Sequence, residues 1–361
     1  MTDVEPVAMR HALARLARAE DLGQDEVVAV FREIMAGACE PAQIGALLLG
    51  LACKGERTEE IVGAATVMRE AVIRIPTTRA RVLDTCGTGG SGVARRNVST
   101  AVAIAVAACG VPVAKHGNRG AGSPCGSADV LEALGVDLAT PPGHVGQMID
   151  RIGIGFLFAP ALHPAMKHAA AVRRSLGVRT IFNLLGPLTI PAFAKRQMLG
   201  VFDPRRCRDL AAALAELGSE RVLVVHGFRA GVTADEDAIA GIDDASPEGA
   251  TLVWELFEGA LHRRVVTPED AGLARVPLAD LAGEDPRGNA EALLRLFEGE
   301  PGPYRTAVQL SGALALLAAS DAGWDTLPDH AARIGAVLDD GGARTVLAEL
   351  LAGSHDGART P

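Results

Sequence analysis

Residues 81–110 read RVLDTCGTGGSGVARRNVSTAVAIAVAACG, in which a short apolar run, a glycine-rich loop and a long apolar stretch follow one another. The apolar run predicts a buried strand, and the stretch after Asn97 predicts a helix. Glycine adopts positive φ at little cost, so the backbone amides of such a loop can face inward and bind an anion, most often phosphate. Taken alone, a loop of this kind is more often a tight turn between a strand and a helix.

The same succession of an apolar strand and a helix or loop recurs along the chain. The further strand candidates are VPVAKHG (111–117), GIGFLFAP (153–160), QMLGVF (197–202) and RVLVVHG (221–227). This alternation predicts an α/β fold with a central, mostly parallel sheet. Because parallel sheets bind ligands at the carboxyl ends of their strands, we expect the glycine loop, Lys115–Gly117 and His226–Gly227 to meet at one edge.

Both ends of the chain read as helices. Helical patterns cover residues 25–37, 41–55 and 58–72, with Pro41 in a first turn and Thr58 as an N-cap, and they resume from about Gly288. We therefore expect a small helical domain over residues 1–78 and a large α/β domain over residues 79–361 that carries the C-terminal helices.

The composition indicates a globular protein with a sizeable core, since 48% of its 361 residues are hydrophobic and 22% are charged. The net charge of −9 argues against nucleic acid or an anionic membrane as the main partner. The six cysteines are scattered without a Cys-x-x-Cys pair, which favours reduced thiols over a zinc site. The N-terminus lacks a signal-peptide core and the apolar runs are too short to span a bilayer, so we expect a cytoplasmic protein.

A second glycine-rich segment, AKHGNRGAGSPCGSAD (114–129), follows the second strand candidate. It crowds Lys115, His116 and Arg119 among its glycines and serines. A solvated charged loop does not need so many glycines, whereas a loop that wraps a polyphosphate does, because cations and backbone must both reach the oxygens. At the start of the preceding helix, Ser99 and Thr100 could bind phosphate or a metal, or could simply cap the helix.

Four segments together resemble one known family, the anthranilate phosphoribosyltransferases, in order, spacing and residue types over residues 16–353. They are GTGGSG…NVST, AKHGNRGAGSPCGSADVLEALGV, FLFAPALHPAMKHAAAVRRSLGVRTIFNLLGPL and NAEALLRLFEG. The resemblance implies a nucleoside phosphorylase/phosphoribosyltransferase-like α/β domain joined to a small helical domain, usually as a homodimer through the helical part. It implies transfer of phosphoribose from phosphoribosyl pyrophosphate to the amine of anthranilate, with Mg²⁺, in tryptophan biosynthesis.

The resemblance also implies roles for individual residues. Lys115, Asn118 and Arg173 would act in catalysis, and the planar guanidinium of Arg173 would pair with the aromatic carboxylate. Mg²⁺ would bind Ser99 and the pair Asp235–Glu236. Anthranilate would contact Gly87, Asn118, His163, Arg173 and Pro187. Phosphoribosyl pyrophosphate would contact Gly87, Gly90, Ser91, Arg95, Asn97, Val98, Ser99, Thr100, Lys115, His116, Gly117, Asn118, Arg119, Ser123 and Ser127.

Without the resemblance, blander readings of several of these residues stay open. Arg173 could be a surface arginine on a helix, and His163 could be a core histidine. Asp235–Glu236 could be a solvated acidic loop that binds no metal. No residue of the sequence stands out as a general base, and positioning with electrostatics would carry the rate.

Four positions depart from the family's pattern. Ser91 stands in place of Asp, Arg95 and Arg96 replace a hydroxyl residue and an aromatic residue, and Gly122 replaces a serine. The two arginines either reach the donor phosphates or point to solvent. Three other functions therefore stay open: transfer to another aromatic amine or nitrogen heterocycle, a nucleoside phosphorylase, and a non-catalytic paralogue that binds nucleic acid.

Overall fold

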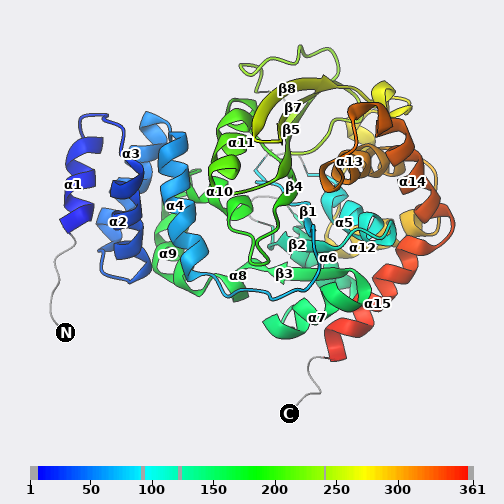
Figure 1. Ribbon diagram of the computed structural model, residues 1–361, viewed down its shortest axis with the longest axis horizontal. Helices are drawn as coiled ribbons and strands as arrows, with labels where there is room; N and C mark the ends of the chain where they lie inside the picture. Colours follow the sequence, from blue (N-terminus) through cyan, green and yellow to red (C-terminus); the bar gives the residue numbers. More distant parts are fainter. Residues whose placement is uncertain (1–6, 91–93, 121–123, 240, 357–361) are drawn as a thin grey trace.

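The computed structural model describes residues 7–90, 94–120, 124–239 and 241–356. Ser91, Gly122 and Ser123, which the sequence placed at the phosphate loops, lie outside the described residues. The N-terminal part consists of the helices α1 (Val7–Leu16), α2 (Gln24–Met35), α3 (Pro41–Lys54) and α4 (Thr58–Ala71). Figure 1 shows these helices in blue to one side of a central sheet. The predicted boundary near residue 78 stays a prediction.

The start of α4 differs by one residue from the expectation. Arg57 is the N-cap and Thr58 is the first helical residue. The buried carboxylate of Glu60 accepts the backbone N–H of Arg57 at 2.8 Å and that of Leu22 at 2.8 Å, and it lies 3.0 Å from Lys54 Nζ. A negative charge in the first turn also interacts favourably with the helix dipole. The Glu60 carboxylate therefore accepts a backbone N–H at the start of α4, the role that the sequence assigned to the side chain of Thr58.

Within the described residues, the sheet has eight strands and is parallel through its centre. Its strands are β1 (Leu83–Asp84), β2 (Val113–Gly117), β3 (Ile154–Phe158), β4 (Arg196–Gly200), β5 (Arg221–Phe228), β6 (Gly241–Ile242), β7 (Thr251–Phe257) and β8 (Ala260–Val266). The order is β3-β2-β1-β4-β5-β7-β8, with β6 paired to β5. The strands from β3 to β5 are mutually parallel, and all five were predicted. The predicted α/β fold is confirmed.

The hairpin of β7 and β8 was not predicted from the sequence. Its turn residues, Glu258 and Gly259, have φ of 50° and 75°, which suits a tight two-residue hairpin turn. β8 is exposed along most of its length and carries His262, Arg263 and Arg264 in succession. A strand without a buried face lacks the alternation by which strands are recognised. The hairpin extends the parallel sheet with antiparallel strands at one edge.

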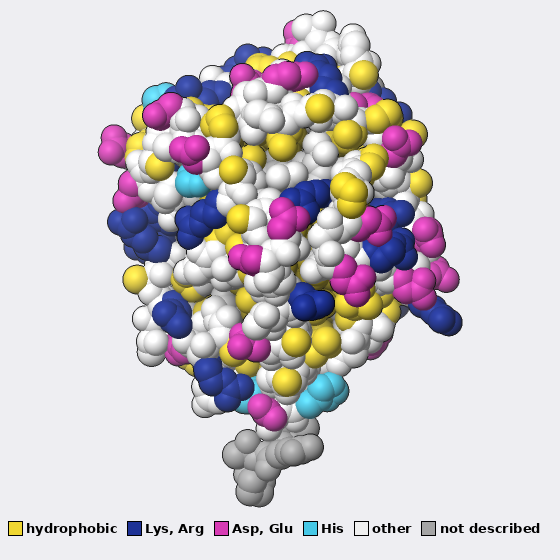
Figure 2. Space-filling model, turned by 90° about the vertical axis from the view of Figure 1, so that its right-hand side faces the viewer, with side chains coloured by type: hydrophobic (Ala, Val, Ile, Leu, Met, Phe, Trp, Pro, Cys, Tyr) yellow, Lys and Arg dark blue, Asp and Glu magenta, His cyan; other side chains and the backbone are white. Residues whose placement is uncertain are grey.

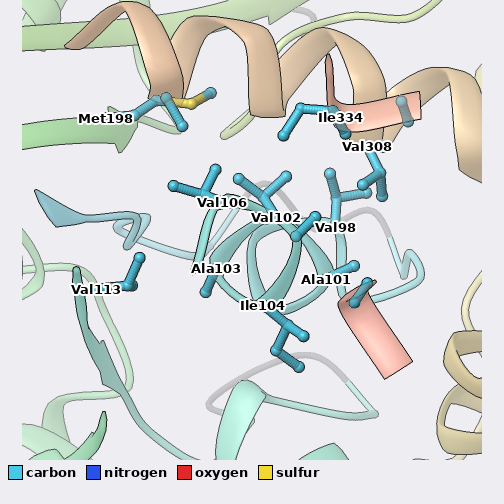
Figure 3. Close-up of a cluster of buried hydrophobic side chains, with 14 of the residues drawn as sticks. Val98, Ala101, Val102, Ala103, Ile104, Val106, Val113, Met198, Val308 and Ile334 are labelled. Atoms are coloured by element: carbon cyan, nitrogen blue, oxygen red, sulfur yellow. The ribbon is translucent and has the colours of Figure 1, made fainter. Parts of the chain in front are cut away.

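Helices cover both faces of the sheet. On one face α5 packs against α13, and Figure 3 shows Val98, Val102 and Val106 of α5 pointing toward Val308 and Met198. On the other face the core is continuous with that of the N-terminal helices. The helices of the α/β part are α5 (Val98–Ala108), α6 (Ser127–Leu134), α7 (Pro142–Ile152), α8 (Ala159–Leu162), α9 (Lys167–Leu176), α10 (Phe182–Leu185), α11 (Cys207–Glu216), α12 (Pro286–Phe297), α13 (Pro303–Ala319), α14 (Leu327–Asp339) and α15 (Gly342–Asp356).

The molecular surface carries both signs of charge. On the face shown in Figure 2, Lys and Arg side chains are interspersed with Asp and Glu side chains. A nucleic-acid interface instead gathers basic side chains into a patch or stripe. Among the described helices, none is both long and apolar enough to cross a bilayer.

Candidate active site

The glycine loop after β1 lies at the carboxyl ends of the parallel strands, as predicted. Gly87 pairs with Gly200 at the end of β4, and the Thr88 N–H donates to the Gly200 carbonyl at 2.8 Å. Gly89 and Gly90 have backbone φ angles of 67° and 85°, which residues other than glycine rarely adopt. The loop is thus anchored on β4 while its glycines take the turn that leads toward α5.

The first turn of α5 is held by the C-terminal helices. Asn97 is the N-cap residue, and within the described residues its side chain makes no capping hydrogen bond. Its Oδ1 instead accepts Asn289 Nδ2–H at 2.9 Å, and its carbonyl accepts the Tyr304 hydroxyl at 3.2 Å. Ser99 and Thr100 lie inside the helix, so neither is the cap. The Val98 N–H donates to the Arg96 carbonyl at 2.8 Å, and the remaining amides of a helix start favour an anion nearby.

The buried side chain of Lys115 links the segments after β1 and at the end of β2 through hydrogen bonds. Its Nζ donates to the carbonyl of Thr85 at 2.9 Å and to that of His116 at 3.1 Å, and its side chain is buried. The His116 N–H donates to Asp84 Oδ1 at 2.9 Å. These bonds fix β2 to β1 just before the two glycine-rich loops. Lys115 therefore positions the loops in this conformation.

His116 and His163 form a buried imidazole pair. Their Nε2 atoms are 3.3 Å apart. Burial lowers the pKa of His116 to about 3, helped by its neighbours His163 and Lys115, and burial lowers the pKa of His163 to about 4. Both rings are therefore neutral at neutral pH, and one can donate its N–H to the other. The pair connects strand β2 with the segment that follows α8.

The end of β2 is tightly packed at Gly117. A Cβ there would lie 2.2 Å from Ser127 Oγ and 2.6 Å from the Phe156 ring, so only glycine fits. Ser127 Oγ donates to the carbonyl of Asn118 at 3.3 Å. Arg119 instead turns to α6, where its guanidinium pairs with Asp129 and Glu132. The predicted donor contact of Arg119 would need these ion pairs to break.

Arg173 presents a half-buried cation on an aromatic face. Its guanidinium carbon lies 5.0 Å from the centroid of the Phe182 ring, and burial lowers its pKa. Among the described residues, no carboxylate acts on the pKa of Arg173, for which burial is the only cause of the shift. A half-buried guanidinium with an unused planar fork suits a carboxylate ligand. Nearby in the sequence, Pro187 is buried and its carbonyl accepts Gln197 Nε2–H at 2.9 Å.

The acidic pair at the glycine loop is Asp243–Asp244, which lines a small pocket with Ser99 and Gly87. This pair directly follows Ile242 of β6, which packs into the core on the α5 face of the sheet. Asp235–Glu236 lies on the opposite face, where Glu236 Oε1 accepts Trp254 Nε1–H at 3.0 Å. Of the two acidic pairs, Asp243–Asp244 lines the pocket with Ser99, whereas the predicted metal ligands Asp235–Glu236 are not among its lining residues; the metal role of Asp235–Glu236 stays a prediction.

The carboxylates of this pair face Arg95. Arg95 Nη2 donates to Asp243 Oδ1 at 2.6 Å, and Arg95 Nη1 lies 3.8 Å from Asp244 Oδ2. Asp244 Oδ1 accepts the hydroxyl of Ser311 at 2.9 Å. Burial raises the pKa of Asp244, while Arg95 and Ser311 oppose that shift. Arg95 therefore neither points to solvent nor stands free for a phosphate in this conformation.

Comparison with known proteins shows the family. Residues 79–344 match the α/β domain, and residues 10–72 the helical bundle domain, of the glycosyl transferase family. An anthranilate phosphoribosyltransferase from Parvibaculum lavamentivorans is 46% identical over 355 residues, which cover 98% of this chain and 98% of that protein. The chain belongs to the anthranilate phosphoribosyltransferase family. The resemblance seen in the sequence is thereby confirmed.

Solved structures of the anthranilate phosphoribosyltransferase family share this fold. The crystal structure of the Thermus thermophilus enzyme has a TM-score of 0.87 and 43% identity, covering 95% of this chain and 99% of that one. The Saccharomyces cerevisiae enzyme in complex with phosphoribosyl pyrophosphate and Mg has a TM-score of 0.86, with 96% and 98% covered. At 23% identity the yeast structure supports the fold alone.

The Mg²⁺ that the family implies can be tested against the residues of the pocket. In the described part of the chain, no group of three or more His, Cys, Asp or Glu side chains is placed to hold a metal. Mg²⁺ at a phosphate site commonly takes only one or two protein carboxylates and completes its shell with phosphate oxygens and water. Asp243, Asp244 and the Ser99 hydroxyl fit such a site, because they line the same pocket.

Sequence reasoning missed several residues of this anthranilate phosphoribosyltransferase site. Asp243–Asp244 follows a strand of only two residues, Gly241–Ile242, which leaves too little pattern in the sequence to be recognised. Asn289 and Tyr304 act through Asn97, from positions about two hundred residues away, and Arg179 Nη1 donates to the Gly90 carbonyl at 3.0 Å. Such distant partners leave no local signal in a sequence.

Proposed function

We propose that the chain transfers the phosphoribosyl group of phosphoribosyl pyrophosphate to the amine of anthranilate and releases pyrophosphate, as a step of tryptophan biosynthesis. The observation that carries the proposal is the pocket at the strand ends, where the glycine loop, Ser99 and Asp243–Asp244 meet. Its relatives at high coverage are named for this activity.

The donor half of the proposal uses backbone and hydroxyl groups. The amides of the glycine loop and the first turn of α5, with Asn97, Ser99 and Thr100, would bind the pyrophosphate and the ribose phosphate. Ser99 and Asp243–Asp244 would hold Mg²⁺, which when bound neutralises charge on the departing pyrophosphate. Gly117, Asn118 and Ser127 would close the loop over the donor, and Lys115 would position that loop from below.

The acceptor half uses Arg173 and the two imidazoles. Arg173 would take the carboxylate of anthranilate through its guanidinium fork, beside Asn118 and Pro187. His163 would line the acceptor's path as a neutral ring, because burial holds its pKa to about 4. An aryl amine is a weak base whose lone pair is already free at neutral pH. The enzyme would therefore act by positioning the amine and stabilising the leaving group.

We also propose that the protein is a homodimer through its helical part. Val7 of α1 and Leu49 of α3 are 71% and 46% exposed there. Contiguous apolar patches are typical of an interaction surface, whereas single exposed apolar side chains also occur on other parts of this molecule, as at Ile239 and Leu294, so the proposal of a dimer rests chiefly on the resemblance.

The test follows the loss of anthranilate fluorescence in the presence of phosphoribosyl pyrophosphate and Mg²⁺. Turnover that needs all three components supports the proposal. Turnover with a substituted aminobenzoate or a nitrogen heterocycle, and not with anthranilate, would show the same fold with another acceptor. Phosphate-dependent cleavage of nucleosides would instead show a nucleoside phosphorylase, and absence of pyrophosphate release with every acceptor would favour a non-catalytic paralogue.

A further inference from the structure

Arg95 is the residue of the glycine loop that the proposed mechanism leaves without a role. Its side chain is only 11% exposed, and so is that of Asp243, with which it forms an ion pair. The pair joins residues 148 positions apart in the sequence. A surface arginine without a structural role would keep its guanidinium in water. The Arg95 guanidinium is instead buried against Asp243, which lines the pocket.

The backbone around Arg95 is fixed, which keeps the guanidinium within reach of the acids. Arg95 forms a β-bridge with Ala282, and the Arg96 N–H donates to the Leu281 carbonyl at 3.0 Å. A Cβ at Gly283 would lie 2.4 Å from the carbonyl oxygen of Arg95, so the two segments touch directly. The backbone of Arg95 is therefore held in place by its contacts with residues 281–283.

The guanidinium takes the carboxylate oxygens that a metal would use. Asp244 Oδ1 is already engaged by the Ser311 hydroxyl, and its Oδ2 faces Arg95 Nη1 at 3.8 Å. Asp243 Oδ1 accepts Arg95 Nη2–H at 2.6 Å. A divalent ion bridging the two carboxylates would have to displace the guanidinium or share the oxygens with a like charge.

We propose that Arg95 is a resident cation of the Asp243–Asp244 pair, which occupies the position of a divalent ion and weakens the binding of that ion to the free protein. The inference rests on the proposed site, although it does not depend on which acceptor is used. A tethered guanidinium neutralises the carboxylates at any Mg²⁺ concentration. The pair would then accept a divalent ion only when the guanidinium moves away.

The size of the effect follows from the contact that must break. Hydrogen bonds to charged groups contribute enough to change an equilibrium constant by about ten- to hundredfold. Removal of the arginine should therefore tighten divalent-ion binding at the pair by at least about tenfold. The repulsion between two cations at one site adds in the same direction.

The experiment measures Mn²⁺ binding to the whole chain without substrates, from the electron paramagnetic resonance signal of free Mn²⁺. The Arg95→Thr protein should bind one ion at least tenfold more tightly than the natural chain. The double variant Arg95→Thr, Asp243→Asn should lose this gain. Equal affinity of the natural and Arg95→Thr proteins would overturn the proposal.

The matched control is Arg96→Gln, which removes the same charge from the neighbouring position. The Arg96 guanidinium carbon lies 5.6 Å from the centroid of the Tyr304 ring, so this side chain packs on Tyr304. An equal gain in Arg96→Gln would attribute the effect to net charge and overturn the proposal.

A further variant covers the case in which Arg95→Thr fails to fold. Asp243→Asn alone should then change Mn²⁺ affinity by less than about threefold, because in the free protein the Asp243 carboxylate is already engaged by Arg95 and adds little to the weak ion binding that remains, and a tenfold loss would overturn the proposal. Absence of transferase activity would not affect any of these readings.

Discussion

Replacing Arg173 by Ala should weaken use of the acceptor far more than use of the donor. Its guanidinium stands half-buried against Phe182 at 5.0 Å, with its fork unused by any described carboxylate. A charge-assisted hydrogen bond to a carboxylate contributes about 1.5–3 kcal/mol, so kcat/KM for anthranilate should fall by about 10- to 150-fold. The KM of phosphoribosyl pyrophosphate should change by less than about twofold, since Arg173 serves the other substrate.

The assay is steady-state kinetics by anthranilate fluorescence, with each substrate varied in turn. Arg173→Lys should recover part of the loss, because a lysine keeps the charge but not the planar fork. Arg174→Ala removes an exposed charge from the next position and should behave as the natural chain. Equal losses in kcat/KM for both substrates would refute the assignment of Arg173 to the acceptor.

Two further predictions follow from the acids and the buried imidazoles. Asp243→Asn should lower turnover at least tenfold, whereas Asp235→Asn with Glu236→Gln should keep it, because only the first acid lines the pocket; the opposite ranking in turnover assays over a range of Mg²⁺ concentrations would contradict this placement. Burial holds the pKa of His163 at about 4, against an ordinary value of 6.5. Between these two pH values the unfolded chain therefore binds more protons than the folded chain. The free energy of unfolding should fall by up to about 1.4 kcal/mol per pH unit as the pH is lowered through this range. Urea unfolding between pH 7 and pH 4.5 should show a shallower fall for His163→Gln and an unchanged one for the exposed His262→Gln; identical slopes in all three proteins would count against the burial of a neutral His163.

The sequence predicted those parts of the fold whose residues are buried on all sides. The strands over 113–117, 154–158 and 196–200 are apolar runs followed by glycine or a helix, because parallel strands lie between two layers of helices. The hairpin of β7 and β8 escaped, because β8 has little buried face and its Glu258–Gly259 turn lacks the usual Asn-Gly or Asp-Gly pattern. Burial alone did not decide recognition, because β7 is mostly buried and was missed together with its exposed partner β8.

The metal ligands show a different limit. Residues 228–245 contain two acidic pairs, Asp235–Glu236 and Asp243–Asp244, and each is a carboxylate pair close to Gly241. Their chemistry is the same, so composition cannot choose between them. The choice is made by which face of the sheet each pair reaches, and that depends on the pairing of β6 with β5 at Gly227 and Phe228. Such a register is a property of the folded sheet and is absent from local sequence.

Arg95 shows why a charged residue at a phosphate loop is not by itself a phosphate ligand. From the sequence, its alternatives were the donor phosphates and the solvent, because the acids it contacts are 148 residues away. The structure adds a third partner, since the carboxylates of Asp243 and Asp244, which follow β6, lie within ion-pair distance of Arg95. An arginine that enters a site with two carboxylates pairs with them first, because leaving buried charges unpaired costs more than giving up a contact with water. The positive charge of Arg95 is therefore neutralised by carboxylates of the protein itself. Arg95 would affect donor binding only indirectly, by changing what Asp243 and Asp244 can bind.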